Sequence, residues 1–186
     1  MNERTLITGL LVGVLYGVWL VAGFVDYLCH RGTDIAKTSG APESWLHLAQ
    51  FAVLSVGMLL ATMLAITPLT FTMLIIAVGA HSVLSYVDVA YTQGRRYISP
   101  LEQHSHSFMD VLPVVSVGLI AVLNWKDLTT AGWAFQVRKP SLSSGELALL
   151  LGSFFTLAGA PILEELVRTT RTQSATAASP PLSSRR

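Results

Sequence analysis

The sequence predicts an all-α integral membrane protein, a bundle of four to five transmembrane helices. Of its 186 residues, 52% are hydrophobic and only 12% are charged, whereas a soluble domain carries roughly a quarter charged residues. The hydrophobic residues also lie in long runs, and a run of about 20 is what an α-helix needs to cross the hydrocarbon core of a bilayer. Composition and run length together place the chain among membrane proteins.

The expected helices cover approximately residues 5–30, 42–66, 68–92, 100–124 and 145–163. The first run is too long for the apolar part of a secretory signal and no small-x-small cleavage site follows it, so we expect a retained helix. Pro42 suits the first turn of the second helix, and Thr67 followed by Pro68 suits the start of the third. The link between these two helices is so short that they are expected to form an antiparallel hairpin.

The fourth helix has the clearest start in the sequence. Ser99-Pro100-Leu101-Glu102 matches a capping box with proline in the first turn, and Pro113 predicts a bend farther along. The segment 125–144 combines tryptophans with basic residues, a composition typical of a membrane interface. Residues 1–168 are expected to form the bundle, and residues 169–186, rich in Ser, Thr and Ala, a disordered C-terminal tail.

The basic residues are distributed unevenly between the two ends of this bundle. With five crossings, one side collects Arg31, Lys37, Arg95, Arg96, Arg168, Arg171, Arg185 and Arg186. The other side has Arg4, Lys126, Arg138 and Lys139. Because basic residues accumulate in cytoplasmic loops, the N-terminus is expected outside and the C-terminus in the cytoplasm.

Histidines and carboxylates recur at helical spacing near the basic side. Asp26 and His30, Glu43 and His47, and Glu102 and His106 are each four positions apart, so the members of each pair share a helix face. All five histidines lie between residues 30 and 106. The candidate metal ligands are Asp26, His30, Glu43, His47, His81, Asp88, Glu102, His106 and Asp110.

The topology brings these side chains to one end of the bundle, because four helices begin or end on the basic side. At 1.5 Å per residue, one group lies roughly 6 to 9 Å inside the helix ends. That group is Asp26, His47, Asp88 and His106. His81 and Asp110 lie deeper, and His30, Glu43, Glu102 and His104 are expected around the mouth. Ionisable groups within a bilayer are costly and normally face a protein interior, so we expect a cluster.

Imidazole and carboxylate ligands in a helix bundle suit a first-row metal. Iron is the favoured cofactor, with zinc, copper and manganese left open, and more than six candidate ligands indicate two ions. Soluble di-iron bundles build their sites from similar ligands. The core ligands are expected to be Asp26, His47, Asp88 and His106. Glu43 and Glu102 are expected to bridge or complete the coordination, and His81 and Asp110 to bind a second metal or support the first ligands.

Simpler readings remain open for several of these residues. Glu102 would also be expected if it only completes its capping box, and Glu43 if it only favours the N-terminus of its helix. The whole cluster would also be expected if it forms an interhelical hydrogen-bond network that stabilises the bundle. His104 points away from His106 and is expected to be exposed. Arg96 is read as a topology signal, or as a partner of Asp88. The pair Glu164-Glu165 lacks the histidine of the protease motif it is similar to, and is assigned no role. Nothing indicates binding of nucleic acid.

In architecture, residues 20 to 112 resemble the membrane-bound di-iron desaturases and hydroxylases, which hold their metals at the cytosolic ends of helices. Where that family has histidine-rich boxes, this chain has only His104-x-His106. The resemblance implies an oxygen-dependent oxidase, hydroxylase or desaturase. Its substrate would be an apolar or lipid molecule dissolved in the membrane, and a separate electron donor would serve it. Two alternatives stay open: a metal-ion or proton transport protein, and a structural or haem-binding subunit of a membrane complex.

Overall fold

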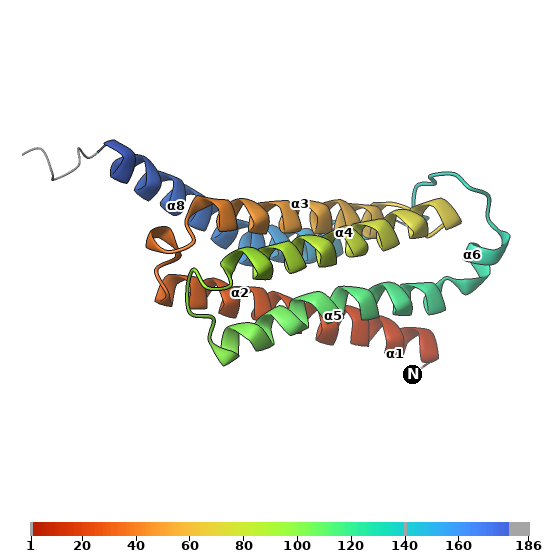
Figure 1. The fold of residues 1–186 in the computed structure, drawn as a ribbon. Coiled ribbons are helices and arrows are strands. Elements are labelled where there is room, and N and C mark those ends of the chain that lie inside the picture. The colour runs from red at the N-terminus through yellow and green to blue at the C-terminus, as the bar shows by residue number, and fades with distance from the viewer. Residues whose placement is uncertain (1, 140, 179–186) are drawn as a thin grey trace, which may run out of the picture.

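A computed structural model describes residues 2–139 and 141–178, and these residues are helical with no strand among them. Within them, five helical stretches are long and apolar enough to cross a membrane (Figure 1). They are Glu3–Gly32, Ala41–Met63, Pro68–Thr92, Pro100–Leu123 and Ser144–Ala178. The predicted all-helical fold with five such stretches is confirmed.

The first stretch is one continuous helix with a wider turn inside it. It consists of α1 (Glu3–Gly9), the π-helical segment η1 (Leu10–Leu15) and α2 (Tyr16–Gly32). The side chain of Asn2 accepts a hydrogen bond from the backbone N–H of Thr5 and so caps the N-terminus. The helix continues two residues beyond its predicted end at residue 30, which places His30 inside the last turn.

The helices α3 (Ala41–Met63) and α4 (Pro68–Thr92) form the predicted antiparallel hairpin. The chain reaches α3 through η2, the short 3₁₀ helix Ile35–Lys37, and through Gly40, whose φ of +73° is a conformation that favours glycine. Thr67 caps α4 with its hydroxyl, as the sequence predicts.

The next helix, α5 (Pro100–Leu123), begins at the predicted residue and contains Pro113. Ser99 accepts from the backbone N–H of Glu102, which is half of a capping box. The other half is missing, because the Glu102 side chain turns into the bundle instead of back to Ser99. The prediction of a full capping box is therefore wrong, and the carboxylate is free for another role.

After α5, the short helix α6 (Trp125–Thr130) leads into an irregular segment that returns to the α3–α4 turn. Gln136 accepts a hydrogen bond from the backbone of Ala65, and Arg138 donates one to the backbone of Met63. The predicted interfacial segment thus crosses one end of the bundle and is tied to it by backbone contacts.

The fifth stretch is longer than predicted. It consists of α7 (Ser144–Phe154), the π-helical segment η3 (Phe155–Gly159) and α8 (Ala160–Ala178). We predicted a helix end near residue 163 and disorder from residue 169, but the helix continues to Ala178. One face of α8 packs on α3 as far as Thr169, whose buried hydroxyl donates to that of Ser44 at 3.0 Å, and residues 173–178 are helical but exposed. Residues 179–186 of the predicted tail lie outside the described residues.

The packing gathers four helix ends and the middle of a fifth helical stretch at one end of the bundle. α3 packs on α4 and α8, and α2 packs on α5. The C-terminal ends of α2 and α4 therefore lie beside the N-terminal ends of α3 and α5, and α8 passes them and continues beyond the bundle (Figure 1). Elsewhere the outer surface is largely apolar, with side chains such as Val21 and Val83 exposed.

Candidate metal centre

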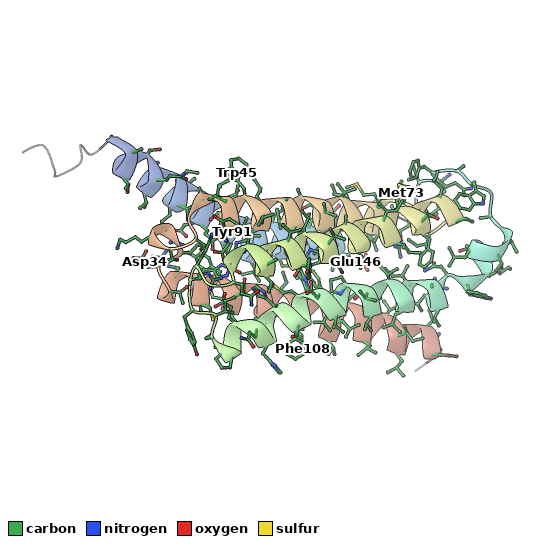
Figure 2. All side chains as sticks on the ribbon, viewed as in Figure 1. Asp34, Trp45, Met73, Tyr91, Phe108 and Glu146 are labelled. Carbon is green, nitrogen blue, oxygen red and sulfur yellow. The ribbon has the colours of Figure 1, made fainter. Side chains whose placement is uncertain are left out.

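A cluster of ionisable side chains is buried where the five helices meet. Figure 2 shows nitrogen and oxygen atoms gathered between the helices at the end near Tyr91. Its fully or nearly buried members are Asp26, His30, Glu43, His47, Asp88, Glu102 and Glu165. His106 joins them with a side chain that is 13% exposed. Burial of this many charges is costly unless each is paired or coordinates a metal.

His30 lies at the centre of the cluster rather than at its mouth, where we expected it. Its Nε2 lies 3.3 Å from Asp26 Oδ2, 3.4 Å from Glu102 Oε1 and 3.9 Å from Glu43 Oε1. The difference arises because α2 extends to Gly32, so that the last helical turn carries His30 inward. A single nitrogen therefore faces three carboxylates from three helices.

Four side chains around this nitrogen form a compact ligand group, which we call group 1. It comprises Asp26, His30, Glu102 and His106, whose ligand atoms all lie within 4.8 Å of one another. His106 Nε2 is 2.9 Å from Asp26 Oδ1. Metal–nitrogen and metal–oxygen bonds of about 2.1 Å place neighbouring ligand atoms roughly 3.0 to 3.4 Å apart. The separations of 2.9 to 3.4 Å between these atoms match that spacing.

A second ligand group shares His30 and adds Glu43 and His47. His47 Nε2 also lies 3.0 Å from Asp88 Oδ2. Glu43 Oε1 is 3.9 Å from the Nε2 atoms of both His30 and His47. We call Glu43, His47 and Asp88 group 2, since one nitrogen of His30 can bind only one ion. Glu43 Oε1 therefore faces one histidine of each group, and its carboxylate also accepts hydrogen bonds from Arg96.

Glu165 on α8 fixes the orientation of both central histidines. Its two carboxylate oxygens lie 2.8 Å from Nδ1 of His30 and 2.7 Å from Nδ1 of His47. The two rings stack face to face, with centroids 4.6 Å apart. Because a carboxylate only accepts, each Nδ1 carries the hydrogen and donates it. A neutral ring must then present the Nε2 lone pair to the carboxylates of the cluster.

Sequence reasoning missed Glu165, although a signal was present. The fifth predicted helix also reaches the basic side, and Glu165 lies just beyond its predicted end. Because the fifth helix was predicted to end at residue 163, Glu165 fell two residues outside it and was not considered as a member of the cluster. The neighbouring Glu164 is exposed and pairs with Arg31 at 3.0 Å, so only one of the two acidic residues belongs to the cluster.

Several buried atoms of the cluster have no hydrogen-bond partner among the described residues. They are Nε2 of His30, Oδ1 of Asp26, Oδ1 of Asp88 and both carboxylate oxygens of Glu102. The contacts of Asp26 Oδ1 and Glu102 Oε1 are therefore ion pairs at short range without hydrogen-bond geometry. Buried polar atoms are nearly always satisfied. A cation among these atoms would satisfy them.

Arg96 supplies the one fixed positive charge in the cluster. Its guanidinium lies 2.5 Å from Glu43 Oε1 and 2.5 Å from Glu102 Oε1, and its side chain is 1% exposed. Burial alone would lower the pKa of Arg96, but its bonds to the two carboxylates raise the pKa above the ordinary value. We expected a topology signal or a partner of Asp88, and the observed partners are Glu43 and Glu102.

The charges of the cluster do not cancel. Five carboxylates (Asp26, Glu43, Asp88, Glu102 and Glu165) stand against the single guanidinium of Arg96, which leaves four negative charges if the histidines are neutral. Two divalent cations would balance them completely. Protonating His30, His47 and His106 would leave one negative charge.

The remaining predicted ligands lie outside both groups. His81 Nε2 is 3.6 Å from Asp110 Oδ1, and Ser85 donates to the other oxygen of Asp110 at 3.0 Å. His81 and Asp110 thus form a pair of their own, about two turns deeper along α4 and one turn deeper along α5. His104 is exposed and contacts only the ring of Phe108 among the aromatic groups described, as expected for an interfacial histidine.

Comparisons of the chain with protein-family models, with curated proteins and with solved structures found no match. Evidence about function therefore comes from the geometry of the cluster.

Proposed function

We propose that this chain is an integral membrane metalloenzyme that binds two divalent first-row metal ions, with iron favoured, at the cytoplasmic end of its helix bundle. The observation that carries the proposal is group 1. Two imidazole and two carboxylate ligands from α2 and α5 converge at coordination spacing, and His30 Nε2, Asp26 Oδ1 and both oxygens of Glu102 accept or donate no hydrogen bond among the described residues. Mixed nitrogen and oxygen ligands of this kind suit iron and its neighbours.

Group 1 would hold the first ion, and group 2 would hold the second. Glu43 would bridge them, because its Oε1 is equally distant from the inward nitrogens of His30 and His47. Glu165 would keep both rings in the ligating tautomer, the role that carboxylates commonly have behind metal-binding histidines. Arg96 would offset part of the carboxylate charge.

Bound iron would supply redox chemistry with dioxygen, as in an oxidase, hydroxylase or desaturase. The residues of the chain would orient the ions, and the packed helix ends would exclude bulk water from them. No described part of the chain resembles a domain for electron supply, so a separate donor protein is part of the proposal. An apolar or lipid substrate follows from the surrounding bilayer. The N-terminus would face outside.

The two alternative functions are less well supported by the arrangement. A transport path should continue through the bundle, but beyond His81 and Asp110 the described interior is mainly apolar. The rings of His30 and His47 stack face to face, so this pair cannot supply the two axial ligands of one haem. The remaining competitor is a purely structural network in which the histidines carry the compensating protons.

Metal content tests the proposal directly. Detergent-purified protein, expressed in metal-replete medium, should contain two equivalents of metal by plasma mass spectrometry. His106→Gln should lose the ion of group 1, and His47→Gln should lose the ion of group 2. His104→Gln is the matched control, because His104 is exposed on the same helix. Wild-type protein without metal would contradict the proposal, and so would metal retained in both cluster variants.

A further inference from the structure

A large apolar cavity occupies the half of the bundle opposite the metal centre. Its volume is about 840 Å³, within the range of pockets that bind small molecules. Residues of the first stretch, α3, α4, α5 and α7 line it. Its apolar walls include Val12, Leu54, Met58, Leu74, Ala77 and Leu112.

The cavity is elongated and reaches toward the metal centre. Along the first stretch its lining runs from Arg4 to Trp19, roughly 22 Å at 1.5 Å per residue. At the inner end, Trp19 and Phe154 stack with their centroids 5.6 Å apart. Ala77 on α4 lines the cavity there and lies one turn from His81 on the same helix face. A long ligand in the cavity would therefore end close to the His81–Asp110 pair, which lies between the cavity and the two ligand groups.

The outer end carries positive charge. Arg4 and Arg138 both line the cavity. Arg4 donates one hydrogen bond to the backbone carbonyl of Leu123 at 3.3 Å, and Arg138 donates one to that of Ala61 at 3.1 Å. A guanidinium has five N–H donors, so most remain available. Glu146 is the one acidic residue in the lining; its carboxylate accepts from the backbone and hydroxyl of Ser143 at the start of α7 and also interacts electrostatically with Arg138.

We propose that this cavity binds the hydrocarbon chain of a single-chain anionic amphiphile, a fatty acid in the simplest case. Arg4 and Arg138 bind its carboxylate, since guanidinium groups form strong charge-assisted bonds with that anion. The chain lies along the apolar walls with its far end at Trp19 and Phe154. The assignment of this amphiphile as the substrate rests on the proposed function. Binding of the amphiphile in the cavity does not require the metals.

Photocrosslinking tests the binding. Palmitate with a diazirine at the end of its chain is added to purified protein in nanodiscs, and the labelled peptides are identified by mass spectrometry. We expect labels near Trp19, Leu112 and Phe154. Labels spread over the lipid-facing surface, with none at these positions, would overturn the proposal.

Two matched glycine variants make the test specific. A Cβ at Gly13 or at Gly118 would meet no atom within 4 Å, but only Gly13 lines the cavity. Gly13→Trp should therefore abolish the inner labels, and Gly118→Trp should keep them. Ser116→Trp fills the cavity from another wall and replaces Gly13→Trp if that variant does not fold. Inner labels that persist in a folded cavity-filling variant would contradict the site.

The head-group contact has its own variant. Arg4→Gln/Arg138→Gln should reduce labelling by palmitate about tenfold or more and leave labelling by a diazirine-bearing alkane unchanged. Equal loss for both probes would contradict recognition of the anion. All labelling is repeated on chelator-treated protein. Labels that persist in metal-free protein support binding of the amphiphile in the cavity, whatever the metal content of the protein. The two proposals, a metal centre and a binding cavity, can therefore fail independently of each other.

Discussion

The buried residues of the cluster differ in what each contributes. Asp26, His30 and His106 present atoms that face one another at ligand spacing, whereas Glu165 faces the outer nitrogens of the two stacked histidines. Glu165 therefore acts on a metal only through the rings it orients. This division between ligating and orienting residues predicts an effect on metal affinity that a purely structural network would not show.

Glu165→Gln should weaken metal binding while the fold is retained. An amide can accept from one Nδ1–H only, and its NH₂ group opposes the other, so one ring loses its fixed tautomer. Removing such an outer partner typically costs 10- to 100-fold in metal affinity. Competition with a fluorescent chelator measures the affinity. Glu164→Gln, which changes an exposed neighbour paired with Arg31, serves as the control and should bind as wild type does. Equal metal affinities in all three proteins would contradict the role of Glu165 in orienting the histidines.

Arg96→Met should destabilise the metal-free protein by about 3–5 kcal/mol, because it leaves Glu43 and Glu102 buried without their partner. Added metal should recover part of that loss by neutralising the same carboxylates. Denaturation in mixed detergent micelles, with and without metal, measures both effects. Arg95→Met is the control, since the Arg95 guanidinium lies over the ring of Tyr91 on the exposed side. A loss in Arg96→Met that metal does not change would indicate that the ions bind elsewhere.

At the residue level the sequence predicts part of the cluster. Helical spacing predicts that Asp26, Glu43, Glu102 and their histidine partners face one way, because that depends only on the 3.6-residue period. It does not predict Arg96 or Glu165, whose positions depend on where a loop and the fifth helix pack. His81 and Asp110 were grouped with the rest by residue type, but their depth separates them from both ligand groups.

At the scale of elements, the starts of the helices were more predictable than their ends. Thr67 with Pro68, and Ser99 with Pro100, mark the starts of α4 and α5 by local chemistry that does not depend on the rest of the fold. The end of the fifth stretch has no such signal. α8 continues through a polar sequence because Thr169 and Glu165 are buried against neighbouring helices, and that packing is not visible in local composition.

Gly159 lies against Phe51 of α3. A Cβ at Gly159 would lie 2.8 Å from Cζ of Phe51, whose ring is held between those of Phe154 and Phe155. Gly159→Ala should therefore push α8 from α3 and cost about 1–3 kcal/mol. Metal affinity should fall with it, since Glu165 lies less than two turns farther along. Gly152→Ala, in the same stretch but with no atom within 4 Å of the added Cβ, should leave stability and affinity unchanged. Thermal unfolding and chelator competition measure the two quantities. Similar results for both variants would contradict this role of the contact.

At the scale of the whole molecule, the bundle has two unlike halves. One half holds the buried charges and the other holds the apolar cavity, and the His81–Asp110 pair lies between them. This division suits an enzyme that receives a hydrocarbon chain from one side and holds its metals at the other. The distribution of basic residues predicts that the metal-centre end faces the cytoplasm.

Cysteine labelling tests that orientation. In a Cys29→Ser background, the chain has no other cysteine. Thr38→Cys places an exposed thiol beside the metal-centre end, and Lys126→Cys places one at the opposite end. We expect a membrane-impermeant maleimide to label only the Lys126→Cys protein in intact cells, and both proteins after lysis. Labelling of Thr38→Cys alone in intact cells would reverse the proposed orientation.

The most direct test of the central claim is a crystal structure of the metal-loaded protein with anomalous diffraction data collected at the metal edge. We predict two anomalous peaks per chain. One should lie among Asp26, His30, Glu102 and His106, and the other among Glu43, His47 and Asp88, with Glu165 behind the two central histidines. Data that show these side chains joined directly by hydrogen bonds, with no anomalous peak among them, would contradict the metal centre and leave a buried network of protonated histidines and carboxylates.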